Sequence, residues 1–179
     1  FDAVTPGHAT PHAGRTALFD DGTGDVTLFD TDAVGTGTLP ESQTVESEAA
    51  HHGVAIELSD GTLLSTIGTS ESRSGVRLLA DDGSELARDE QCPGVHGEGA
   101  LKGETIVFGC EDGVLVFADG AFTKLDAPDA FGRSGNAYVT DTSAIAALDY
   151  KSDPDQEGYL LSQLALVDTD AQTPVSYTH

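Results

Sequence analysis

The chain contains no methionine and no tryptophan, and its 8 lysine and arginine residues are far outnumbered by 31 aspartate and glutamate residues. The formal net charge of -23 argues strongly against binding to nucleic acid or to an anionic membrane surface, because phosphate groups repel such a chain. The same field gathers small cations, although acidic side chains also keep an exported surface soluble. The charge by itself therefore favours a cation ligand only weakly.

Long apolar runs are also missing, since none approaches the roughly 18 residues that a membrane span needs. No signal peptide is visible and the chain starts at Phe1, so we expect a processed or excised piece of an exported protein. Two cysteines, few lysines and abundant threonine, aspartate and glycine suit an oxidising compartment. The sequence thus predicts a periplasmic or extracellular protein without membrane insertion, and we expect a monomer.

An internal repeat indicates the architecture. Four apolar stretches that each end in an acidic turn begin at residues 26, 76, 114 and 164, which are 50, 38 and 50 residues apart: Val26–Asp32, Val76–Asp82, Val114–Gly120 and Leu164–Asp170. A period of about 40 to 50 residues with four short strands per unit is typical of a β-propeller.

The fold prediction is therefore all-β, a propeller with about four four-stranded antiparallel blades. In the third unit we expect strands at 97–101, 104–109, 114–117 and 122–125, joined by Asp-Gly turns of the kind that two-residue hairpins require. No segment has the apolar stripe of an amphipathic helix. Because most propellers have more blades, residues 1–179 are predicted to be a single partial domain of a larger propeller, with blades at about 6–48, 51–91, 95–128 and 133–176.

Three histidines fall at equivalent places in this repeat. His8 and His96 each precede the repeated stretch by 18 residues, and His52 precedes it by 24. The first strand of a propeller blade lines the central channel, so these side chains are expected to converge. Three imidazoles with water or a carboxylate as the fourth ligand can bind Zn²⁺. We expect Glu98 to share the face of His96, because it lies two residues further along the strand. The alternative is that these are ordinary surface-loop histidines.

The neighbouring His51 is a competing ligand for the same position. A strand that begins one residue earlier would turn His51 inward in place of His52. His12 fits the register less well, and the fourth unit offers Arg133, Ser134 and Gly135 at the equivalent place. The candidate metal ligands are therefore His8, His51 or His52, and His96.

The only two cysteines, Cys92 and Cys110, lie on either side of His96. Their 17 intervening residues match no common zinc motif, and thiolate ligation would require a reducing compartment. Because they are expected at the same edge of one hairpin, a disulfide fits better than free thiols or metal ligands. It would support the turn that presents His96.

Motifs of catalysis are scarce. The sequence has no nucleophile elbow, phosphate loop or dinucleotide fingerprint. We therefore predict a protein that is not an enzyme. Two alternatives remain: a metal-dependent, lactonase-like hydrolase with Glu98 as its base, and a non-catalytic interaction scaffold.

Several segments resemble the zinc metallochaperone family of the Azt ABC-transporter system. They run in order along nearly the whole chain: Pro6–Arg15 (PGHATPHAGR), Leu18–Gly24 (LFDDGTG), His51–Val54 (HHGV), Cys92–Glu98 (CPGVHGE) and Gly109–Val116 (GCEDGVLV).

The resemblance implies an exported β-propeller that binds Zn²⁺ and delivers it to the solute-binding protein of a zinc ABC importer. It places His8, His51 or His52, and His96 at the family's histidine motifs, and it implies a Cys92–Cys110 disulfide. The terminal His179 stays outside the implied site. A neutral imidazole set also predicts that zinc affinity falls as the pH drops through about 6.5.

Overall fold

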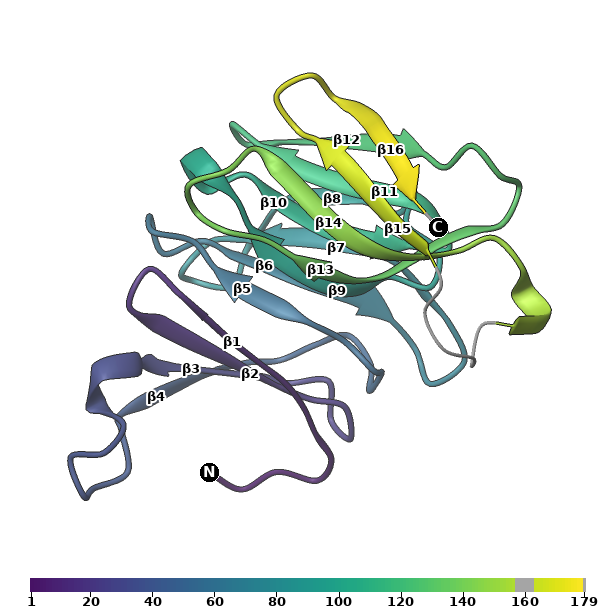
Figure 1. Ribbon diagram of the computed structural model, residues 1–179. Coiled ribbons are helices and arrows are strands. Elements are labelled where there is room, and N and C mark those ends of the chain that lie inside the picture. Colours follow the sequence, from purple (N-terminus) through teal and green to yellow (C-terminus); the bar gives the residue numbers. More distant parts are fainter. Residues whose placement is uncertain (157–162, 179) are drawn as a thin grey trace. The chain divides into compact units, whose positions relative to one another are not determined.

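A computed structural model describes residues 1–156 and 163–178 of the chain (Figure 1). It falls into two compact units, Phe1–Glu90 and Gln91–His179, and each is described by itself. The described residues form sixteen strands and three short 3-10 helices, so the prediction of an all-β chain is confirmed. No helix in these ranges is long and apolar enough to cross a membrane.

The first unit starts with a four-stranded antiparallel sheet. Its order is β1-β2-β3-β4, and a 3-10 helix, η1 (Thr31–Ala33), follows β3. Ala13 and Gly14 both have positive φ and form the two-residue turn that the twist of a tight hairpin requires. The strands are β1 (Pro6–His12), β2 (Arg15–Asp20), β3 (Val26–Asp30) and β4 (Ser42–Val45).

A second antiparallel sheet of order β5-β6-β7-β8 completes this unit. Its turns contain Gly61 and Gly83, both with positive φ, as the Asp-Gly pairs at 60–61 and 82–83 predict. Strand β5 lies beside β1 and β2, and apolar residues of both sheets form one core that includes Phe19, Leu28 and Leu63. The strands are β5 (Ala55–Glu57), β6 (Leu63–Gly68), β7 (Arg73–Leu79) and β8 (Glu85–Asp89).

The second unit contains two further four-stranded meanders, joined by one parallel pair between Asp112 and Gly132. Val116, Leu148 and Val167 belong to their common core. The 3-10 helices are η2 (Lys102–Glu104) and η3 (Pro154–Gln156). The strands are β9 (His96–Ala100), β10 (Ile106–Cys110), β11 (Asp112–Ala118), β12 (Ala121–Asp126), β13 (Gly132–Tyr138), β14 (Ile145–Lys151), β15 (Gln163–Asp168) and β16 (Thr173–Thr178).

The predicted strands of the third unit agree with β9 to β12 within a few residues. Cys110 pairs with Gly113 across the turn at 111–112, and Ala118 pairs with Ala121 across Asp119 and Gly120. Both central residues of the second turn have positive φ. Turn chemistry in the sequence was therefore a reliable guide to where these hairpins close.

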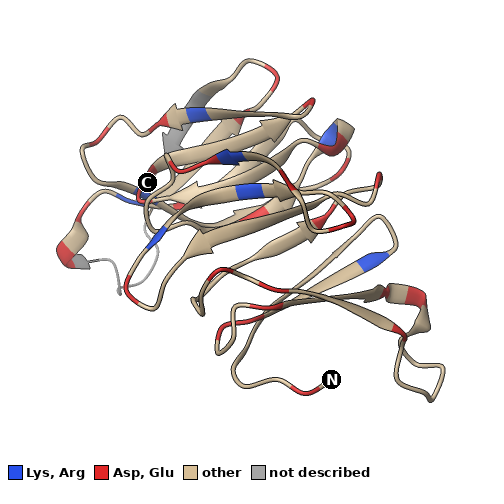
Figure 2. Ribbon diagram, turned by 180° about the vertical axis from the view of Figure 1, so that it is seen from behind, with Lys and Arg blue, Asp and Glu red and all other residues tan. Residues whose placement is uncertain are grey.

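Part of the acidity of the chain lies in turns, and Figure 2 shows acidic residues gathered at strand ends. Among the residues that the structure describes, six aspartates accept a hydrogen bond from the backbone N–H two residues further on, namely Asp20, Asp30, Asp60, Asp82, Asp153 and Asp168. Hydrogen bonds from backbone N–H groups, those of Val4 and Thr5 above all, hold the pKa of Asp20 below its usual value. These carboxylates form turns, which explains part of the negative charge without a metal ligand.

Candidate metal centre

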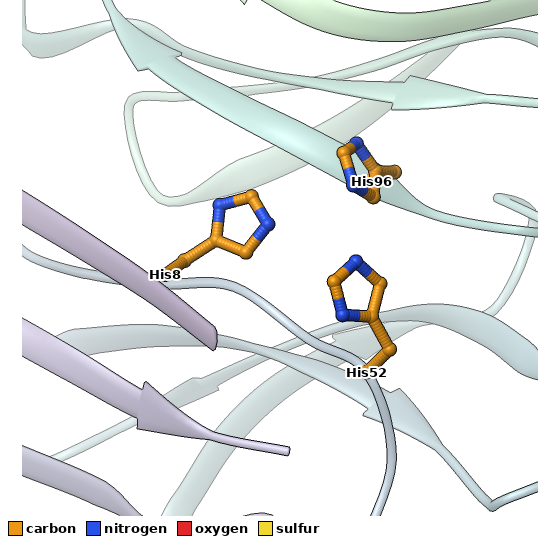
Figure 3. Close-up of side chains that lie close together, drawn as sticks. All are labelled: His8, His52 and His96. Carbon is orange, nitrogen blue, oxygen red and sulfur yellow. The ribbon is translucent and has the colours of Figure 1, made fainter. Parts of the chain in front are cut away.

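In the first unit, His8 and His52 lie next to one another (Figure 3). His8 is half-buried on β1, and His52 lies in the loop before β5 with 43% of its side chain exposed. Their ring centroids are 5.4 Å apart, and one ring nitrogen of each lies within 4.8 Å of the other. Two histidine nitrogens on a tetrahedral zinc ion are separated by about 3.3 Å. A small side-chain rotation would therefore let this pair share an ion.

Asp21 fixes the orientation of His52. Its Oδ2 lies 2.5 Å from His52 Nδ1, and its Oδ1 accepts the backbone N–H of Gly53 at 3.3 Å. The backbone N–H of Asp21 donates to the carbonyl of Thr5, which ties the carboxylate to the start of β1. A carboxylate on Nδ1 leaves Nε2 as the acceptor nitrogen of the neutral ring, and outer-sphere carboxylates orient zinc-binding histidines in the same way.

The position of the Asp21 carboxylate requires a glycine at residue 7. A Cβ on Gly7 would lie 2.3 Å from Asp21 Oδ1, so the residue before His8 has no room for a side chain. Asp21 was not among the site residues predicted from the sequence. Its 31-residue separation from His52 gives no sequence signal, because the contact joins two different sheets of the unit.

His51 has a different environment from its neighbour. It is 3% exposed, and both of its ring nitrogens are hydrogen-bonded: Nδ1 lies 2.8 Å from the carbonyl oxygen of Ala49, and Nε2 lies 3.1 Å from Thr66 Oγ1. Burial lowers the pKa of His51 from its ordinary value, which favours the neutral ring. The adjacent histidines thus point to different surroundings, His51 into the core of the unit and His52 toward His8 and Asp21.

In the second unit, His96 is the first residue of β9 (Figure 3). It is half-buried, and its Nδ1 lies 3.4 Å from the carbonyl oxygen of Gly135 on β13. An Nδ1–H that donates to a carbonyl leaves Nε2 as the acceptor, as in His52. The fourth meander supplies a backbone carbonyl here and no imidazole, in agreement with the sequence prediction for residues 133–135.

A β-bulge lies directly after His96. His96 pairs with Gly109 and Glu98 pairs with Phe108, so Gly97 is an extra residue and has a φ of 63°. The prediction that Glu98 shares the face of His96 is wrong, because the extra residue interrupts the alternation of side chains. Glu98 lies on the face of Phe108, opposite to that of His96.

His8 also lies at a bulge. Pro6 pairs with Asp20 and Ala9 pairs with Leu18, so β1 has one more residue than β2 around His8. Each of these histidines therefore belongs to an irregular stretch in the first strand of a meander. This local similarity agrees with their equal distance from the repeated stretch, because bulges redirect side chains and recur next to functional sites.

A cavity of about 200 Å³ opens beside His96 in the second unit. Asp149 accepts the backbone N–H groups of Gly135 and Asn136 at 2.5 and 2.6 Å and so fixes one wall. Arg133 and Lys151 also line the cavity. The cavity therefore borders the contact between His96 and Gly135.

The two cysteines form a disulfide, as predicted. Both residues are fully buried, and the backbone N–H of Glu111 donates to the carbonyl of Pro93 at 2.8 Å next to the bridge. The bridge joins residues 18 apart and contributes about 3 kcal/mol in the chain-entropy model. It holds the segment that leads into His96, and its sulfur atoms are not thiolate ligands.

The other two histidines lie outside this arrangement. His12 pairs with Arg15 beside the hairpin turn of β1 and β2. His179 lies outside the described residues. The structure thus brings His8 and His52 together in the first unit and places His96 at a corresponding bulge in the second.

No family model matches the chain. A search of curated proteins finds the zinc chaperone AztD of Citrobacter koseri, 30% identical over 114 residues, which make up 62% of this chain and 27% of that protein. The structure of apo AztD from Citrobacter koseri aligns with a TM-score of 0.69 and 19% identity, over 99% of this chain and 59% of that one. A second Citrobacter koseri AztD structure gives 0.63 and 18%, over 97% and 57%.

A quinonprotein alcohol dehydrogenase-like protein from Bacteroides thetaiotaomicron aligns with a TM-score of 0.56 and 12% identity, over 95% of this chain and 44% of that one. These neighbours confirm the propeller class of the fold, and the resemblance to AztD is confirmed. The chain spans less than two thirds of the AztD proteins that it matches. Together with the disulfide, the likeness supports an extracytoplasmic location.

Replacing Gly97 with alanine tests the bulge that orients His96. The new Cβ would lie 2.2 Å from the carbonyl oxygen of Gly135, at a backbone φ of 63° that alanine rarely adopts. Gly103→Ala is the matched control, because Gly103 has a φ of 71° but open space around it. We expect Gly97→Ala to lower the free energy of unfolding, measured by urea denaturation, by about 2 kcal/mol more than the control. If the two variants lose the same free energy of unfolding, the contact between β13 and this bulge is not as close as described.

Proposed function

We propose that this chain is the zinc-binding part of an extracytoplasmic zinc metallochaperone. The observation that carries the proposal is the His8–His52 pair with Asp21 on Nδ1 of His52, because a carboxylate-oriented imidazole beside a second imidazole is a typical zinc-site arrangement. Support also comes from the name of the curated relative, zinc chaperone AztD.

The proposed ligands are His8, His52 and His96. For His96 the support is its place in the repeat, its bulge and its Nδ1 contact with a carbonyl oxygen, which leaves Nε2 for a metal. His52 is preferred over His51, since both ring nitrogens of His51 bond within the core. A water molecule or a carboxylate of a partner would complete a tetrahedral site. Glu98 is a poor fourth ligand because the bulge puts it on the other face of β9.

Three neutral imidazoles also suit Cu²⁺ and Ni²⁺, so zinc rests on the relative's name together with the donor set. The exposure of the His52 side chain, 43%, favours a site where ligands exchange rather than a sealed structural site. An ion held in this way can be handed on, which is what a chaperone must do.

A catalytic role has less support. The named relative is a chaperone, which supports the prediction that the chain is not an enzyme. A metal-dependent hydrolase needs a carboxylate base beside the metal-bound water, and Glu98, the base considered from sequence, lies on the wrong face of β9. The interaction scaffold would be favoured if the protein bound no zinc. The single partial domain with its four blade boundaries, the monomeric state and the lack of nucleic-acid binding stay predictions.

Three single substitutions test the ligand set. His8→Ala, His52→Ala and His96→Ala should each weaken zinc binding on the order of 100-fold or more, because each removes one of three protein bonds to the ion. Calorimetric titration of the full-length protein with zinc at neutral pH measures the affinity. His12→Ala is the control, since His12 lies at the hairpin turn of the same strand as His8 and should leave the affinity unchanged. Undiminished binding in all three ligand variants would overturn the site.

Delivery of zinc to the solute-binding protein of a zinc ABC importer is the finer proposal. Zinc-loaded protein mixed with the metal-free solute-binding protein should transfer its ion faster than zinc dissociates into a chelator, because direct transfer bypasses the free ion. The ratio of the two rates, followed by a zinc-dependent change in the recipient's fluorescence, is the measurement. Equal rates would mean that the protein only releases zinc to solution.

A further inference from the structure

The segment that carries His52, residues 46–54, lies between two strands and is not part of a sheet. Strand β4 ends at Val45 and β5 begins at Ala55, and residues 46–54 belong to neither. Within this segment the backbone carbonyl of Val54 accepts a hydrogen bond from the N–H of Thr66 at 3.1 Å. The position of His52 therefore depends on side-chain contacts of its neighbours.

Asp21 contacts His52 and Gly53 from one side. From the core side, the side chain of His51 connects the residues that flank His52 through a continuous series of hydrogen bonds. The N–H of Val54 donates to Thr66 Oγ1 at 3.1 Å, the Thr66 hydroxyl lies 3.1 Å from His51 Nε2, and His51 Nδ1 lies 2.8 Å from the carbonyl oxygen of Ala49. A carbonyl accepts only, so Nδ1 carries the proton and Nε2 accepts from the hydroxyl. The Thr66 hydroxyl and the His51 ring then each accept one hydrogen bond and donate one, and together they connect the backbone of residues 49 and 54, on the two sides of His52.

The ring of His51 also fits its space closely. The ring of Phe19 meets it edge to face at 5.0 Å, and a Cβ on Gly68 would lie 2.9 Å from the His51 ring. A Cβ on Gly53 would lie 2.4 Å from both Thr66 Oγ1 and the Phe19 ring. A flat ring with one donor and one acceptor on opposite sides fills this site, and glycines at 53 and 68 leave room for it.

We propose that His51 is a positioning residue for zinc binding, which acts by holding the backbone on both sides of His52. The inference rests on the proposed function, because His52 must be a ligand for its position to matter. The two consecutive histidines then have separate roles: the first fixes the segment from inside the core, and the second binds the metal. Outer-sphere groups of this kind change metal affinity by about 10- to 100-fold.

Substitutions at Thr66 and His51 test this role. Thr66→Val keeps the size and branching of the side chain but removes the hydroxyl. His51→Phe keeps an aromatic ring at this position but removes both hydrogen bonds. Each should weaken zinc affinity of the full-length protein at least about tenfold. Thr66→Ser retains the hydroxyl and should bind zinc within about twofold of wild type. Leu28→Ala is the control for stability. It creates a cavity in the core of the same unit, so it should destabilise the protein but leave zinc affinity unchanged.

A spectroscopic measurement separates positioning from a loss of stability. At saturating Co²⁺ the visible absorption of the bound ion reports ligand geometry, so Thr66→Val should alter the band and Thr66→Ser should not. If His51→Phe does not fold, the two Thr66 variants decide. If Thr66→Val binds zinc with wild-type affinity and has an unaltered Co²⁺ spectrum, while His52→Ala has lost zinc binding, the positioning role of His51 is wrong but the zinc site stands. Full zinc binding by His52→Ala would instead overturn the proposed function and the inference with it.

Discussion

The contact between the Asp21 carboxylate and His52 Nδ1 is the interaction on which the candidate site depends. It joins the end of β2 to the loop before β5, so it requires that the two sheets of the first unit are packed on their shared core. It also requires a glycine at position 7, because any side chain there would collide with the carboxylate. Folding of the unit thus fixes the tautomer of His52 before any metal arrives, which lowers the cost of ordering the ligand on binding.

Several acidic residues form turns, and the candidate metal site uses a different carboxylate, Asp21. Asp20, Asp60 and Asp82 accept backbone N–H groups within their own turns, and such carboxylates shape hairpins. Asp21 differs from Asp20 beside it, because Asp20 binds the backbone of Val4 and Thr5 whereas Asp21 reaches a histidine. A net charge of -23 still favours the approach of cations over long distances. The specificity for a metal must come from the imidazoles.

The sequence predicted the strands and the pairing of His8 with a histidine at 51 or 52, because the repeat register and the Asp-Gly turns are local or periodic signals. It could not separate His51 from His52, since a change of one residue in register exchanges their faces and the segment around them is irregular. The wrong prediction that Glu98 shares the face of His96 has a related cause. Gly97 is an extra residue in β9, and the sequence alone does not indicate whether a glycine in a strand forms a bulge. The role of Asp21 depends on a contact between sheets that no spacing encodes.

X-ray absorption at the zinc edge, on the full-length protein loaded with one equivalent of zinc, would decide whether three imidazoles bind the ion. It counts the imidazole groups around the ion and distinguishes nitrogen and oxygen from sulfur. We expect three histidine ligands at about 2.0 to 2.1 Å with one further oxygen, and no sulfur, because both cysteines are in the disulfide. Scattering from sulfur, or a shell of oxygen atoms without imidazole, would contradict it.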